Sequence, residues 1–288
     1  MRIGFIGAGK MGFTLGKHIK EAYKSLPEPG MDNEVIGYYS RSLSSAREAA
    51  QFTETEYYES IENLVDYCDT LFITTPDGQI EDVTKELGRI IDGKSKEMIL
   101  VHTSGALSSQ VFSGMGNHVY GYSVHPIYAV NSKTESYVNF SRAYITIEGH
   151  ERYIDELKKL FSSLGHPVKI IDADNKTKYH GAAVFASNLV VGLYSRAVAL
   201  LSECGFDREE AGRALLPLFM NNADNLAEKG IKAALTGPVA RGDADTVKKH
   251  LSVLCGGDRE IYRLLSEELI NIAGLKAEVH DSMREVLK

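Results

Sequence analysis

The chain has 288 residues, of which 43% are hydrophobic and 25% are charged, and its formal net charge is −7. This composition is typical of a globular protein with one large domain or two. The negative charge, with no offsetting basic run, argues against a nucleic-acid partner, which normally needs a basic face. Cys68, Cys204 and Cys255 are odd in number and widely spaced, so neither a disulfide framework nor a thiolate zinc site is expected. The remaining histidines and acidic residues show no metal-ligand spacing, and we expect no metal.

The N-terminal segment and the apolar runs indicate the cellular location of the protein. From Met1 the sequence enters a β-like segment rather than a signal-peptide pattern. The most apolar run, residues 182–194, is shorter than a bilayer crossing needs and contains Ser187 and Asn188. We therefore expect a cytoplasmic protein with no membrane partner.

The first half of the chain alternates short β-rich runs with helix-like segments, which predicts a parallel sheet with crossover helices. The runs lack strict alternation, so helices should cover both faces of the sheet. The predicted strands are residues 3–6, 35–39, 70–74, 98–102, 119–125, 144–147 and 168–171. The predicted helices of this half are 12–22, 44–51, 80–90 and 151–164. The expected fold class is α/β, with a doubly wound, mostly parallel sheet of the Rossmann type.

The composition changes near residues 172–175, and no convincing strand follows. We therefore expect a first domain at residues 1–172 and an all-α second domain at residues 173–288. Pro217 should kink the second of the C-terminal helices. These helices are predicted at 176–204, 208–226, 243–254 and 259–273, with one more at the C-terminus.

A glycine loop directly follows the first predicted strand and opens a helix. Its residues are Gly7, Ala8, Gly9, Lys10, Met11 and Gly12. In dinucleotide-binding folds the first glycine permits a tight turn, the second lets the backbone approach the pyrophosphate, and the third lets the helix pack against the sheet. The positive end of the helix dipole then favours phosphate. The alternative is a turn that merely needs flexible residues. The loop predicts that the first domain binds a dinucleotide.

The end of the second predicted strand indicates which dinucleotide. An NAD site places Asp or Glu there for the ribose 2′-hydroxyl, whereas this chain has Ser40, Arg41 and Ser42. Arginine can pair with a 2′-phosphate, and the two serines offer hydroxyl groups. We therefore expect NADP(H). The alternative is that Arg41 is an ordinary surface arginine at the start of the next helix.

Two further strand ends should lie near the cofactor, because ligands of such sheets bind outside the carboxyl ends of the strands. One end carries Thr75 and Pro76, and the other carries His102 and Ser104. Each could instead be a loop with a helix cap, which is the role expected for Asp77.

Several motifs together resemble a known family. They are HTSGAL at 102–107, His125 with Pro126, YHxAA at 179–183, and TGPxxRGD at 236–243. The chain resembles, over nearly its whole length, a family of Rossmann-like proteins of unassigned function that are regarded as NADP-dependent oxidoreductases. It is more distantly similar to pyrroline-5-carboxylate reductase, the 3-hydroxyacid dehydrogenases and prephenate dehydrogenase. This resemblance implies a homodimer that forms through the helical domain.

The resemblance does not carry over a catalytic residue set. The 3-hydroxyacid dehydrogenases use a Lys-x-x-x-Asn pair. Here Lys178 is followed four residues later by Ala182, and Val184 stands one turn before Asn188. A mechanism built on that pair is not expected.

Histidine suits proton transfer near neutral pH, and His180 at the start of the first C-terminal helix is the first candidate for a general acid or base. Asn188 could orient the substrate. The alternative is that both pack between helices. His125, before Pro126, could orient the substrate or only shape an extended turn. By analogy with the active-site loop of pyrroline-5-carboxylate reductase, Arg241 would bind an anionic group on the substrate. Alternatively, Asp243 caps the next helix and Arg241 pairs with a nearby carboxylate.

The resulting hypothesis is an NADP(H)-dependent oxidoreductase acting on a small anionic carbonyl or imine compound. The alternative is an NADP-binding sensor or regulatory protein without turnover, which would keep the glycine loop but would need no proton donor.

Overall fold

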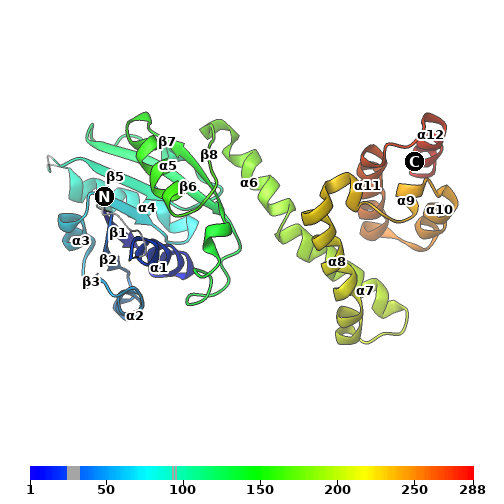
Figure 1. Ribbon diagram of the computed structural model, residues 1–288, viewed down its shortest axis with the longest axis horizontal. Helices are drawn as coiled ribbons and strands as arrows, with labels where there is room; N and C mark the ends of the chain where they lie inside the picture. The colour runs from blue at the N-terminus through cyan, green and yellow to red at the C-terminus, as the bar shows by residue number, and fades with distance from the viewer. Residues whose placement is uncertain (25–32, 93, 95) are drawn as a thin grey trace. The chain divides into compact units, whose positions relative to one another are not determined.

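A computed structural model describes residues 1–24, 33–92, 94 and 96–288. It contains an eight-stranded sheet with the order β3-β2-β1-β4-β5-β6-β7-β8 (Figure 1). Neighbouring strands are parallel except for β6 and β7, which are antiparallel. The strands are β1 (Arg2–Ile6), β2 (Glu34–Tyr39), β3 (Glu56–Tyr58), β4 (Thr70–Ile73), β5 (Met98–His102), β6 (Val119–Ile127), β7 (Tyr144–Gly149) and β8 (Val168–Ile170).

Helices cover both faces of this sheet, as expected. They are α1 (Lys10–Lys24), α2 (Leu43–Thr53), α3 (Ile61–Tyr67), α4 (Asp77–Ile91) and α5 (Ile154–Ser163). One buried cluster joins Phe5 of β1 to residues of α1, α2 and α5. The other joins Ile6, the next residue, to residues of α3 and α4. Successive side chains of a strand point to opposite faces, so β1 contributes to both cores. The α/β fold class is confirmed.

The sequence analysis missed β3. This edge strand has only three residues, and its Tyr57 is exposed. A run so short and so poorly buried gives no clear hydrophobic pattern.

The chain divides into two compact units, Met1–Phe185 and Ala186–Lys288. The first unit includes α6 (Lys176–Phe185), so the division falls later than the expected boundary after residue 172. Hydrogen bonds from Lys176 and Tyr179 to the sheet tie α6 to this unit.

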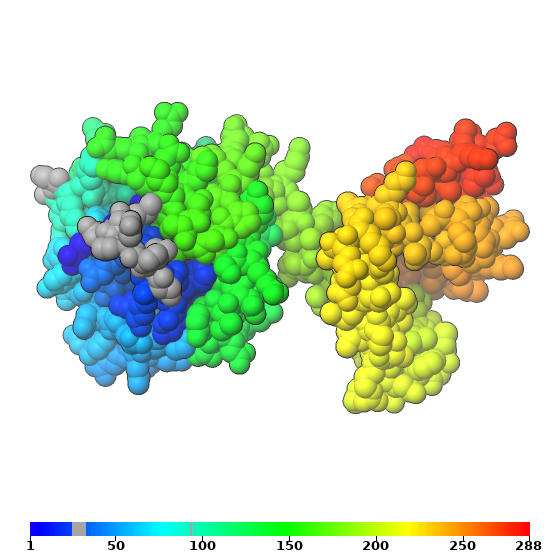
Figure 2. Space-filling model, viewed as in Figure 1, coloured from blue at the N-terminus to red at the C-terminus, as the bar shows by residue number. Residues whose placement is uncertain are grey.

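All regular elements of residues 186–288 are helical, and this part of the chain is described throughout. Their small core contains Val239, Val247, Leu251, Ile270 and Met283. The helices are α7 (Asn188–Glu203), α8 (Arg208–Ala234), α9 (Pro238–Arg241), α10 (Ala244–Val253), α11 (Gly256–Ala273) and α12 (Ala277–Val286). Most of α8, yellow in Figure 2, is exposed.

One expectation about these helices was wrong. The predicted helix 176–204 is interrupted, because Ser187 has φ −129° and ψ −86° and becomes the N-cap of α7. Pro217 lies inside α8, where a kink was expected, and the residue of α8 with non-helical backbone angles is Gly230, with φ 75° and ψ 174°. Glycine adopts such angles without a Cβ clash, so it breaks a helix more readily than the pattern suggested.

One helical stretch passes a test that core helices of soluble proteins also pass. The helical stretch Ala173–Glu203 is long and apolar enough to cross a membrane by length and composition alone. Its most apolar 18-residue window has a mean hydropathy of 1.6, and 6% of that window is buried. The surface of this stretch is therefore largely uncovered within a single chain.

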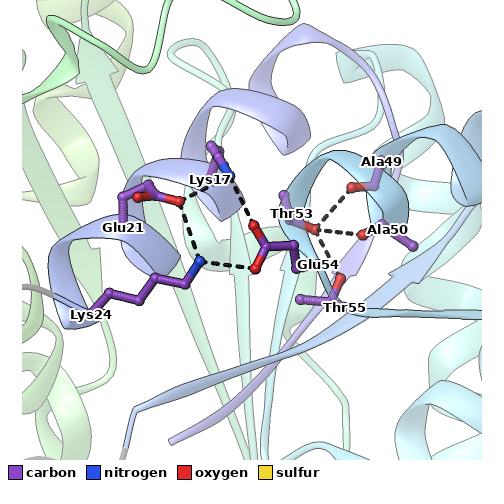
Figure 3. A network of polar contacts seen from close by, with 8 residues as sticks. All are labelled: Lys17, Glu21, Lys24, Ala49, Ala50, Thr53, Glu54 and Thr55. Carbon is purple, nitrogen blue, oxygen red and sulfur yellow. Dashed lines mark hydrogen bonds and ion pairs between the residues drawn. The ribbon is translucent and has the colours of Figure 1, made fainter.

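A surface network joins the helix after the glycine loop to the helix after Ser40–Ser42 (Figure 3). Lys17 and Lys24 of α1 both contact Glu54 at the end of α2, at 3.9 Å and 2.9 Å. Glu54 has the left-handed φ of 56°, which ends α2. Exposed ion pairs contribute little to stability, so this network is a local link between α1 and the end of α2.

Candidate cofactor and catalytic site

The glycine loop lies where the strand order reverses, between β1 and β4. Gly7 has φ +112°, and a Cβ on it would lie 2.9 Å from the Thr74 backbone. A Cβ on Gly12 would lie 2.5 Å from the Gly7 carbonyl oxygen. The Thr74 hydroxyl donates to that carbonyl at 2.8 Å, which joins the ends of β1 and β4. The loop therefore needs glycine at Gly7 and Gly12 for steric reasons, in agreement with the sequence argument.

A cavity of about 310 Å³ opens beside this loop. The predicted cofactor residues that line it are Gly7, Ala8, Gly9, Ser40, Arg41, Thr75 and Pro76. Residues of α4, including Asp82 and Glu86, form another part of its wall. The cavity thus collects the ends of β1, β2 and β4, where the sheet rule places a dinucleotide.

Three observations fit a bound dinucleotide. A Cβ built on Gly9 meets no atom within 4 Å, so the backbone there faces open space. The Thr75 hydroxyl oxygen is buried and has no hydrogen-bond partner in the described part of the chain. Arg41 is exposed and lines the cavity at the end of β2. An anionic ligand at the N-terminus of α1 would supply acceptors for these groups.

The other predicted cofactor residues do not line this cavity. Lys10, Met11 and Gly12 belong to the first turn of α1. The Ser42 hydroxyl oxygen caps α2 by accepting from the Ser45 backbone N–H at 3.3 Å. Ser42 therefore acts as a helix cap.

His102 and Ser104 hold the loop that follows β5. The fully buried His102 ring accepts from the Ser104 N–H at Nδ1, at 3.2 Å, and donates from Nε2 to the Ser108 carbonyl, at 3.1 Å. Burial lowers the pKa of His102 to about 4, so the ring is neutral at pH 7. The Ser104 hydroxyl donates to Asp77 at 2.7 Å, which links this loop to the start of α4. Both ring nitrogens of His102 are thus occupied within the protein.

His125 and His180 converge on Gly105. Their ring centroids are 6.2 Å apart. A Cβ on Gly105 would lie 2.5 Å from His180 Nδ1 and 2.8 Å from His125 Nε2. His180 Nδ1 is buried and has no hydrogen-bond partner among the described residues. Two histidines that the sequence singled out separately therefore meet just beyond the carboxyl end of β5.

Tyr179 and Thr146 complete the surroundings of His125. His125 Nδ1 lies 2.6 Å from the Tyr179 hydroxyl, and the Thr146 hydroxyl lies 3.0 Å from the same oxygen. Thr146 is directly opposite His125 in the β6–β7 ladder. Burial, then the nearby Lys176 charge, lowers the pKa of His125 to about 3. His125 is therefore a neutral imidazole at physiological pH.

Sequence reasoning missed Lys176, the first residue of α6. Its side chain is only 2% exposed, and Nζ donates to the Ser123 hydroxyl at 2.7 Å. Burial lowers the pKa of Lys176 to about 8. The available signal was the spacing of Lys176, Tyr179 and His180, since residues at i, i+3 and i+4 share a helix face.

Asn188 and Arg241 belong to the second unit. Asn188 is exposed at the start of α7 and accepts from the Ser187 hydroxyl at 3.1 Å. Arg241 is exposed at the end of α9. Asp243 caps α10 by accepting from the Thr246 N–H at 3.0 Å. Catalytic roles for Asn188 and Arg241 remain predictions.

Comparison with known families adds a second line of evidence. Residues 143–269 match the family described as a domain of unknown function (DUF2520). Residues 1–89 match the oxidoreductase family with an NAD-binding Rossmann fold. These two matches confirm the resemblance to Rossmann-like proteins of unassigned function, with an NAD-binding Rossmann fold matched at residues 1–89. None of the curated proteins matches the chain.

Solved structures of similar proteins support the same fold. A Bacteroides fragilis protein, named as a candidate NADP oxidoreductase, is 27% identical over 93% of this chain and 97% of its own, with a TM-score of 0.68. A Thermotoga maritima protein is 26% identical over 94% of this chain and 98% of its own, with a TM-score of 0.70. The 1-pyrroline-5-carboxylate reductase of Streptococcus pyogenes is 18% identical over 100% of this chain and 96% of its own, with a TM-score of 0.57, and shares the fold.

Proposed function

We propose that the protein is an NADP(H)-dependent oxidoreductase that acts on a small, anionic carbonyl or imine compound. The observation that carries the proposal is the convergence of His125 and His180 on Gly105, at the end of β5. That strand lies next to β4, whose end lines the glycine-loop cavity. Cofactor-binding groups and proton-carrying side chains thus occupy adjacent strand ends in one unit.

The choice of NADP(H) over NAD(H) rests on the end of β2. Arg41 lines the cavity where folds of this type place the adenine ribose, and Ser40 stands beside it. Their guanidinium and hydroxyl groups suit a 2′-phosphate. Asp82 and Glu86 reach the cavity from α4 rather than from β2. The similar protein from Bacteroides fragilis is also named for NADP.

Bound NADPH would supply a hydride, and the chain's own residues would position the substrate and move a proton. We assign His180 as the acid or base, because its buried Nδ1 is unpartnered among the described residues. His125, neutral and in contact with Tyr179, would offer a hydrogen bond to the substrate oxygen or nitrogen. Arg241 is the proposed contact for an anionic group, and Asn188 a proposed orienting residue.

We also propose a cytoplasmic homodimer that forms through the helical unit. Large apolar side chains are exposed on α7 and α8, among them Leu189, Val191, Leu193, Leu216, Leu218 and Phe219. Contiguous apolar surface on a folded chain usually marks an interface. A second copy would cover the exposed window of Ala173–Glu203 without a membrane.

Cofactor binding is tested first. The chain has no tryptophan, so calorimetric titration is the direct measurement. We expect NADPH to bind at least tenfold more tightly than NADH, and Arg41→Ala to remove most of that difference. Arg47→Ala is the matched control. Arg47 is an arginine of the following helix α2 whose guanidinium stacks on Tyr57 and does not line the cavity. Equal affinity of the unmodified protein for both cofactors would overturn the NADP(H) assignment.

Turnover separates the enzyme from a non-catalytic NADP sensor. The protein with NADPH is screened against small carbonyl and imine compounds that carry a carboxylate. We expect consumption of NADPH that is lost in His180→Ala while NADPH affinity is retained. Two results together would instead identify a sensor. The protein would bind NADPH tightly without turning over any compound of the screen, and it would capture a protein partner only when NADPH is bound.

A further inference from the structure

Glu148 of β7 is a buried carboxylate that contacts the end of the loop that follows β5. Its side chain is 1% exposed. Its two oxygens accept from the Ser109 backbone N–H at 2.6 Å and from the Ser109 hydroxyl at 2.7 Å. Glu148 thus holds the far end of the loop whose near end contains Ser104 and Gly105.

The ladder between β6 and β7 places Glu148 beside Ser123. The two residues are direct partners in the antiparallel register. His125 and Thr146 form the pair two positions further along the ladder. Opposed residues of such a ladder carry their side chains on one face, with Cβ atoms about 4.5–5.5 Å apart. Glu148 and His125 therefore belong to the same face of the sheet.

Helix α6 contacts this face at two rungs. Lys176 donates to Ser123, and Tyr179, one turn later, contacts His125 and Thr146. The Ser123 hydroxyl in turn donates to the Ser104 carbonyl at 3.3 Å. The buried Lys176 is thereby connected, through Ser123, to the loop that carries Gly105.

We propose that Glu148 is a positioning residue of the site: its carboxylate, opposite Ser123 in the ladder, compensates the charge of Lys176, which donates to Ser123, and it holds the 104–109 loop through Ser109. A buried ammonium needs a compensating charge, since a lone ion in a protein interior is costly. Lys176 donates to a neutral hydroxyl, that of Ser123, and the carboxylate of Glu148 acts on its charge through space.

The charges around Lys176 favour this assignment. Glu148 is the larger of the two carboxylate influences that raise the pKa of Lys176, and Asp77 of α4 is the other. Burial acts in the opposite direction and dominates, which leaves the pKa at about 8. His102 of β5, His125 of β6, and Tyr179 and His180 of α6 also face this region. Asp77 is exposed to solvent, so Glu148 is the less screened carboxylate.

The consequence lies near neutral pH. With Glu148 charged, Lys176 is an ammonium at pH 7. Without that charge, the pKa of Lys176 falls below its present value, and the population of the neutral amine at pH 7 rises. Any role of this proton in catalysis rests on the proposed reductase function, but the coupling between Glu148 and Lys176 does not.

The test is a titration of Lys176 by NMR in protein labelled with ¹³C and ¹⁵N lysine, with the signal assigned by its loss in Lys176→Met. We expect Glu148→Gln to lower the Lys176 pKa by roughly one unit, and Glu148→Asp to restore most of it. Glu151→Gln, at an exposed position, is the matched control. An unchanged Lys176 pKa in Glu148→Gln would overturn the proposal.

A second measurement covers the case in which Glu148→Gln does not fold. The double variant Lys176→Met with Glu148→Gln removes both charges and nearly preserves both shapes. We expect it to be more stable in thermal unfolding than either single variant, because each single change leaves one buried charge uncompensated. Strictly additive losses would overturn the proposal. NADPH titration of the same proteins reports separately on the proposed function.

Discussion

The Tyr179 hydroxyl lies 2.6 Å from His125 Nδ1, so the tautomer of His125 sets which of the two groups donates in this contact. The Thr146 hydroxyl lies 3.0 Å from the Tyr179 oxygen and 3.2 Å from the His125 carbonyl oxygen, and when it donates to Tyr179 the Tyr179 hydrogen is available for Nδ1. A neutral His125 that accepts at Nδ1 has its proton on Nε2. Nε2 is the atom that lies toward Gly105.

We therefore predict that His125 is the Nε2–H tautomer at pH 7 and that Tyr179→Phe removes this preference. If His125 orients the substrate, turnover should fall about tenfold or more, because a misoriented donor forfeits its stabilising hydrogen bond. Histidine ¹⁵N chemical shifts measure the tautomer without any substrate. A dominant Nδ1–H form in the unmodified protein would contradict the assignment.

Gly105→Ala should damage the site sterically. The new methyl group would lie 2.5 Å from His180 Nδ1 and 2.8 Å from His125 Nε2, so a ring or the loop must move. Such overpacking costs about 1–3 kcal/mol of unfolding free energy. Gly181→Ala, in the same helix as His180, meets no atom within 4 Å and should instead be neutral or stabilising. Denaturant unfolding compares the two, and equal stability of both variants would contradict the close approach at Gly105.

Acid should destabilise the protein through its buried histidines. Burial lowers the pKa of His102 to about 4, whereas an unfolded histidine titrates near its ordinary value of 6.5. Between these values the unfolded state binds more protons, so stability is fully present above about pH 6.5 and is lost as the pH falls toward 4.

Thermal unfolding at several pH values measures this loss. We expect His102→Asn to reduce the pH dependence of the unfolding free energy by up to about 1.4 kcal/mol per pH unit, because one group that binds a proton on unfolding is removed. The same slope in His102→Asn as in the unmodified protein would contradict the prediction.

The proposed homodimer predicts that charges on the exposed helices separate the subunits. Val191 of α7 is 71% exposed and Leu218 of α8 is 61% exposed. We expect Val191→Lys with Leu218→Lys to convert a dimer into a monomer in sedimentation, while NADPH binding is retained. Val138→Lys, at a 65% exposed site in the first unit, is the control. An unmodified protein that is monomeric and binds phospholipid vesicles would overturn the dimer proposal.

Local sequence patterns determined the sheet and the cofactor loop. The buried strands gave apolar runs without alternation, and the need for glycine at Gly7 and Gly12 follows from their sequence position between strand and helix. Two features were not predicted from the sequence. They are β3, which has three residues, and the break in α8, which depends on the backbone angles of Gly230. Such features depend on tertiary context rather than on periodicity.

The sequence by itself determined that His102, His125 and His180 were candidates, but only the tertiary structure decided how they differ. Hydrogen bonds commit both ring nitrogens of His102 to a loop, whereas His125 and His180 converge on Gly105. Spacing alone could place Lys176 on the helix face of His180, but its burial and its charge compensation beside Glu148 arise only when α6 packs on the β6–β7 ladder. Composition and spacing identify which chemistry a chain contains; the low dielectric and the neighbours that tune each group exist only in the folded protein.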